Sequence, residues 1–128
     1  MELVQLETTY LPAFALDRPE IVHEAVIEVL AGLFPTVSAH MLLSSDRLGQ
    51  TTAWVRQVAM YLMVRRAGVS MLTTARLFGR DRTTVRHALA LIDDIAAMRP
   101  ATASLIDFLD LEMRAALDRL AQNERGQA

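Results

Sequence analysis

The sequence predicts an all-α protein of about six helices, and three observations support this. No stretch alternates apolar and polar residues as a half-buried strand does. Apolar residues recur instead at intervals of three and four, which is the spacing of a helix face. Several glycines and prolines, namely Pro35, Gly49, Gly68, Gly79 and Pro100, fall between these stretches, where helices end and turns begin. With 128 residues, the chain is long enough for one domain with a real hydrophobic core.

The first 16 residues have no clean period and are expected to form an N-terminal arm. A helix start is predicted at Asp17, because Glu20 follows it at capping-box spacing and Pro19 lies in the first turn. A broad apolar stripe follows, and Pro35 is expected to end this helix.

The middle of the chain begins with a short helix, predicted from Ser38 to Leu43, and an exposed loop over residues 44–50. Thr51 or Thr52 is expected to cap a third helix, which Gly68 ends. Because this helix is apolar almost all round, it should occupy the centre of the fold.

Two capped helices follow in close succession. Ser70 is expected to cap a short fourth helix that ends at Gly79. Asp81 is expected to cap a fifth helix that starts at Arg82 and ends before Pro100. The inward stripe of this fifth helix is predicted to be Val85, Ala88, Leu89, Ile92 and Ala96.

A sixth helix is predicted to start at Thr102 or Ser104, and residues 122–128 are expected to fray. Two roles are open for this segment, residues 101–128. Its apolar stripe can pack on the core, or it can pair with a second copy to form a homodimer, as helix-turn-helix proteins commonly do.

Charge is unevenly distributed along the chain, although the net charge is only −2. Residues 47–87 carry eight arginines and one acid, a local charge of +7. Residues 1–46 and 88–128 carry −6 and −3. A basic middle flanked by acidic segments is typical of a protein that presents one face to a polyanion.

Several classes of function are disfavoured. The absence of cysteine excludes disulfides, thiolate metal sites and cysteine nucleophiles. The three histidines are dispersed, so no metal site and no catalytic constellation is expected, and the protein is not expected to be an enzyme. No signal peptide, membrane span or phosphate-binding loop is recognised, so we expect a cytoplasmic, nucleoid-associated protein with no cofactor and no bound nucleotide.

The fourth helix, the turn at Gly79 and Arg80, and the fifth helix have the lengths of a helix-turn-helix. In that motif the start of the second helix enters the DNA major groove. Arg82 is expected to read bases, because arginine can bind guanine O6 and N7 bidentately. Thr84 is expected to contact a phosphate together with backbone N–H groups, while Asp81 acts mainly as the cap. The other outward side chains at this helix start are Thr83, Arg86 and His87.

Two stretches, RQVAMYL at residues 56–62 and RDRTTVRHA at residues 80–88, carry a resemblance to a known family. Residues 17 to about 97 resemble the C-terminal DNA-binding domain of the bacterial chromosomal replication initiator, DnaA. The resemblance implies a Trp-repressor-like helix-turn-helix domain, which we place at residues 17–100. It also implies DNA contacts at four residues of this chain: Asp81, Arg82, Thr83 and Thr84.

The resemblance further implies that the basic region from Arg47 through Arg56 and Gln57 contributes, with an arginine of the loop entering the minor groove. The sequence departs from the family in three places. Arg82 replaces the family's histidine, a single Gly79 stands where two small residues are usual, and the loop before the third helix holds only one arginine. These departures bear on which base pair is read and on the angle of approach.

The sequence therefore predicts a binder of double-stranded DNA that regulates replication initiation or transcription at initiator-box-like sites. The alternative is a protein-interaction module that keeps the same fold and binds an acidic protein through the basic face.

Overall fold

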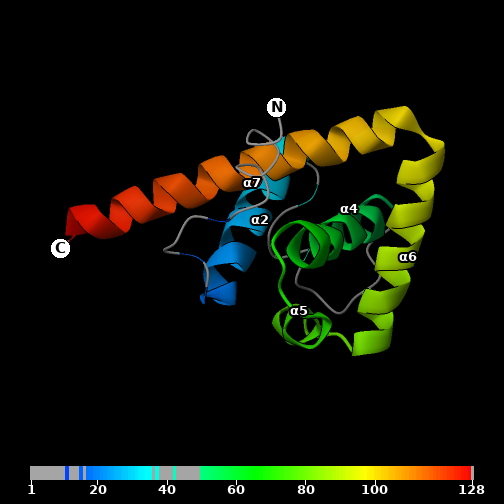
Figure 1. Cartoon of the computed structure of the whole chain (residues 1–128), viewed down its shortest axis with the longest axis horizontal. Helices are drawn as coiled ribbons and strands as arrows, with labels where there is room; N and C mark the ends of the chain where they lie inside the picture. Colours follow the sequence, from blue (N-terminus) through cyan, green and yellow to red (C-terminus); the bar gives the residue numbers. More distant parts are fainter. Residues whose placement is uncertain are drawn as a thin grey trace, which may run out of the picture.

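The computed structural model describes residues 11, 15, 17–35, 37, 42 and 50–127, with the backbone alone at residues 50 and 127. These residues form helices and connecting turns and no strand, which confirms the all-α prediction. The elements in chain order are α2 (Pro19–Leu33), α4 (Gln50–Tyr61), the π-helical turn η2 (Leu62–Arg66), α5 (Met71–Phe78), α6 (Arg82–Met98) and α7 (Pro100–Gln127) (Figure 1). The helix predicted at 38–43 lies outside the described residues, except for Leu42.

The central helix is α4, as predicted from the apolar residues on almost all of its sides. Val55, Val58 and Ala59 are fully buried in it, and Leu62 and Met63 continue the buried face into η2. α4 packs against α6 and α2, while α7 crosses α2 and reaches η2. The core therefore lies between α2, α4, α6 and α7, and α5 is attached at the side of α6.

The π-helical turn η2 ends the central helix. The N–H of Ala67 donates to the carbonyl of Leu62 at 2.9 Å, a bond to the fifth preceding residue that widens the helix. Gly68 then adopts a left-handed conformation with φ of 76°, which glycine reaches without steric cost. The chain turns here toward α5, so the prediction that Gly68 stops this helix is confirmed.

Helix starts were predicted less accurately than helix ends. The cap predicted at Asp17 is wrong: Arg18 takes the cap position, no side chain caps the helix, and Pro19 occupies the first turn. The start predicted at Thr51 or Thr52 is also wrong, because α4 already begins at Gln50 and the Thr52 side chain is buried.

The last helix is longer than the sequence predicts at both ends. α7 begins at Pro100 rather than at Thr102 or Ser104, because proline needs no N–H partner in a first turn. It also continues to Gln127, so the expected fraying of residues 122–128 is not observed up to that residue. Arg18 binds Glu124 at 2.9 Å and thus ties this end of α7 to the start of α2.

Within the described part of the chain, no helix combines the length and apolar character that crossing a membrane requires.

Candidate nucleic-acid interface

α5 and α6 are joined by a turn of three residues. Ser70 caps α5 by accepting the Thr73 N–H at 3.1 Å, as predicted. At the other end of α5, Gly79 has φ of 63°, and the N–H of Arg80 donates to the Ala75 carbonyl at 2.9 Å. These two features form a Schellman motif, in which a single left-handed glycine ends the helix and changes the direction of the chain. The single glycine noted in the sequence is therefore sufficient for the turn.

The start of α6 is held by Asp81. Its Oδ1 accepts the N–H of Thr84 at 2.8 Å, which confirms the predicted cap. Hydrogen bonds from the backbone and side chain of Thr84 hold the pKa of the Asp81 carboxyl below its usual range. Because Asp81 occupies the Thr84 N–H, this backbone group is not available to a phosphate, and a phosphate contact at residue 84 depends on the hydroxyl.

The two faces of α6 divide as the sequence predicts. Val85, Ala88, Leu89 and Ile92 are buried against the core, and Ala96 is half-buried. The opposite face exposes a set of polar side chains over the first turn and a half: Arg82, Thr83, Thr84, Arg86 and His87. Arg86 donates from Nη2 to Thr83 Oγ1 at 3.2 Å, so these two side chains are coupled along the exposed face.

Two predicted contact residues lie on α4 and are less accessible. Arg56 is only 9% exposed, and its Nε donates to the Leu42 carbonyl at 2.9 Å. Burial, and then the positive charge of Arg80, lower the pKa of the Arg56 guanidinium. Arg80 lies in the turn before α6, and its positive charge acts on Arg56. Gln57 is half-buried, and Arg47 lies outside the described residues.

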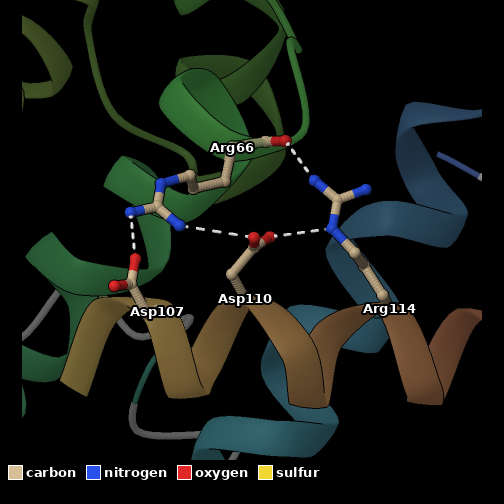
Figure 2. Close-up of polar contacts among 4 residues, drawn as sticks. All are labelled: Arg66, Asp107, Asp110 and Arg114. Atoms are coloured by element: carbon tan, nitrogen blue, oxygen red, sulfur yellow. Dashed lines mark hydrogen bonds and ion pairs between the residues drawn. The ribbon is translucent and has the colours of Figure 1, made fainter. Parts of the chain in front are cut away.

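Two arginines of the basic middle form ion pairs with acids of the same chain. Arg65 binds Asp93 of α6 at 2.8 Å. Arg66 binds Asp107 at 2.8 Å and the buried Asp110 at 3.3 Å, both on α7 (Figure 2). No local spacing in the sequence indicates these acids as partners, because they lie far along the chain from both arginines. The structure places both in contacts between helices.

Arg114 completes the cluster shown in Figure 2. It donates to Asp110 at 3.1 Å and to the backbone carbonyl of Arg66 at 3.0 Å. Asp110 and Arg114 stand four residues apart, a spacing that the sequence shows, but their burial depends on how α7 packs. This cluster joins α7 to the end of η2, and the exposed face of α6 lies elsewhere.

The structure thus defines a helix-turn-helix protein, in which a short capped helix supports a longer one with an exposed basic start. The family described as the bacterial DnaA protein helix-turn-helix matches residues 23–92, and the chain belongs to this family. The helix-turn-helix domain of that family binds double-stranded DNA. The match starts within α2 and ends within α6, so α7 is outside it. No curated protein and no solved structure matches the chain.

Proposed function

We propose that this protein binds double-stranded DNA in a sequence-specific manner by placing the start of α6 in the major groove. The observation that supports this most strongly is the division of α6 into a buried aliphatic side and an exposed start with Arg82, Thr83 and Arg86. A helix fixed from behind can carry side chains into a groove at a defined depth. Arg82 reads a base, preferably guanine, and its neighbours add hydroxyl and charged contacts.

Phosphate contacts come from the residues around the helix start. Arg80 lies in the turn itself, and the buried Arg56 adds positive charge behind it. Gln57, the Thr84 hydroxyl and His87 add further contacts, and Arg47, which precedes α4 in the sequence, completes the set through the minor groove. This set fixes the position of the protein on DNA and adds affinity that does not depend on sequence.

The biological role proposed here is regulation of replication initiation or of transcription at sites similar to initiator boxes, in the nucleoid. The rival is binding of an acidic protein through the same basic face. Both partners carry negative charge, so salt dependence alone does not separate them.

Selection from a pool of randomised duplexes tests the proposal directly. The purified protein is expected to enrich a common motif, and bound fragments of genomic DNA should contain the same motif. The enriched duplex should then bind more tightly than a scrambled one in competition at physiological salt. If no motif is enriched while an acidic protein competes away all bound DNA, the rival function is supported instead.

A further inference from the structure

The outer face of α7 carries apolar side chains that nothing in the described part of the chain covers. Phe108 is 46% exposed and Leu111 is 57% exposed. They belong to a row of exposed residues spaced by three and four along the helix: Ala101, Ser104, Phe108, Leu111, Ala115 and Asp118. The buried residues of α7, among them Leu109, Met113 and Ala116, lie on the opposite side. We call this row the outer stripe.

The outer stripe has the spacing of a two-helix seam, because its residues recur at alternating intervals of three and four positions. From its first to its last residue, the stripe has two small side chains, then the two large ones of Phe108 and Leu111, then a small one and the acidic Asp118. If a second helix with the same stripe runs antiparallel, Phe108 meets Leu111 of the second copy, and Ser104 meets Ala115 of the second copy. Large residues then meet at the centre and small residues meet on both sides, so the stripe fits a copy of itself about a two-fold axis.

Charged residues at the two ends of the stripe also favour this antiparallel arrangement. In the same register, Asp118 lies opposite Ala101 of the second copy, in the first turn of that α7. The helix start carries partial positive charge, and the exposed Arg99 immediately precedes it. Neither Asp118 nor Arg99 has an ion-pair partner within the part of the chain that the structure describes. The two-fold axis repeats this contact, so one dimer contains two of them.

A nucleic acid does not suit this surface. Asp107 is exposed on one flank of the stripe, Glu112 is half-exposed on the other, and Asp118 is in the stripe itself. These acids would repel phosphates, whereas an apolar stripe bordered by acids, with one cation at its end, suits a helix of the same composition.

From these observations we infer that a second copy of this chain docks antiparallel on the outer stripe of α7.

The position of this interface decides whether the two α6 starts of a dimer can bind the same stretch of DNA, a consequence that rests on the proposed function. In Figure 1, α6 leaves the corner with α7 and extends away from it, so that its start and α5 lie at the far end of the molecule. α6 has 17 residues, which corresponds to a length of roughly 25 Å.

A two-fold axis on the outer side of α7 therefore directs the two α6 starts away from each other. They cannot enter successive major grooves of one straight duplex, which requires recognition helices on the same side and one helical turn apart. The dimer instead joins two duplexes, or two distant segments of one DNA molecule.

Sedimentation equilibrium in the absence of DNA tests the interface itself. The mass of the full-length protein should rise from 14.2 kDa toward twice that value as its concentration increases. Leu111→Ser should remain a monomer, and Leu72→Ser, which changes an equally exposed leucine on α5, should dimerise like the wild type. A wild-type protein that stays monomeric, or a Leu111→Ser variant that dimerises normally, overturns the inference.

Charge exchange tests the register. Asp118→Arg and Arg99→Asp should each weaken the dimer by roughly tenfold, because each creates two repulsive contacts. A mixture of the two variants should dimerise like the wild type, because each copy then offers the charge that the other requires. Normal dimers of either variant alone, or failure of the mixture to associate, contradict this register.

Capture of a labelled duplex by a duplex fixed to beads tests the bridging. The wild type should retain the free duplex on the beads, and Leu111→Ser should bind DNA without retaining it. Wild-type dimers that bind DNA without joining two duplexes would overturn the bridging arrangement. Loss of all DNA binding in the wild type would contradict the proposed function and leave the sedimentation results as the evidence on the interface.

Discussion

Arg66 and Asp110 lie 3.3 Å apart between Nη1 and Oδ2, at the place where η2 meets α7. The Asp110 residue is 6% exposed, and Arg114 binds its other carboxylate oxygen. Burial alone lowers the pKa of the Arg66 guanidinium, but the hydrogen bond from Arg66 to Asp107 and the charge of Asp110 outweigh it, so the pKa is raised. One buried carboxylate therefore joins two cations from different parts of the chain.

Replacing Asp110 by alanine should lower the free energy of unfolding by about 2–3 kcal/mol, since two partly buried guanidinium groups lose their anion. The value is below the usual cost for a fully buried pair because the Arg66 side chain is 30% exposed. Asp107→Ala provides the matched control. Its side chain is 69% exposed, and its loss should cost at most about 1 kcal/mol. Urea denaturation measures both values, and equal costs for the two variants would be inconsistent with the buried role of Asp110.

Gly79→Ala should destabilise the protein by about 1–2 kcal/mol, because residue 79 has φ of 63° and an L-residue strains that backbone. No atom lies within 4 Å of the position a Cβ would take, so the cost comes from the backbone alone. Gly32→Ala is the control. It lies in α2 with equal free space, and the change should stabilise the protein by roughly 0.5–1 kcal/mol. Thermal unfolding should therefore shift in opposite directions for the two variants.

Stability should fall as the pH is lowered through about 6.5, because of His23. Burial lowers the pKa of this imidazole. Its Nε2 atom is buried with no hydrogen-bond partner among the described residues, and its ring packs edge-on against Phe78 at 4.8 Å between centroids. Between the two pKa values the unfolded chain binds a proton that the folded chain does not, so lower pH favours unfolding. Below the folded-state pKa, this contribution levels off.

Unfolding free energies measured from pH 7.5 downward check this expectation. His23→Phe should reduce the slope, since phenylalanine fills a similar space and does not titrate. A His23→Phe variant with an unchanged slope would show that another group is responsible.

Features that depend on neighbouring residues were predictable from the sequence, and those that depend on tertiary packing were not. Ser70 and Asp81 each cap a helix through the N–H three residues later, a contact within one turn of chain. The burial of Arg56 depends on the Leu42 carbonyl, 14 residues away, and no local pattern signals it. The turn η2 was missed because it comprises only the last five residues of the central helix, so no residues of that helix follow it that could show a shifted apolar spacing. The contacts of Arg66 with α7 likewise depend on residues 41 and 44 positions later.

Arg82→Ala should reduce discrimination between the selected duplex and single-base variants of it by about 1–3 kcal/mol at one position. Arg82 is exposed and its helix start is held by Asp81, so the change should leave the thermal stability of the free protein nearly unaltered. Thr84→Ala, expected to remove a phosphate contact, should weaken binding to all sequences similarly. Arg125→Ala, an exposed arginine near the end of α7, should alter neither affinity nor preference. Fluorescence anisotropy with each duplex at fixed salt measures these differences. An Arg82→Ala variant that keeps the wild-type preference at every position would mean that residue 82 does not read a base in the groove.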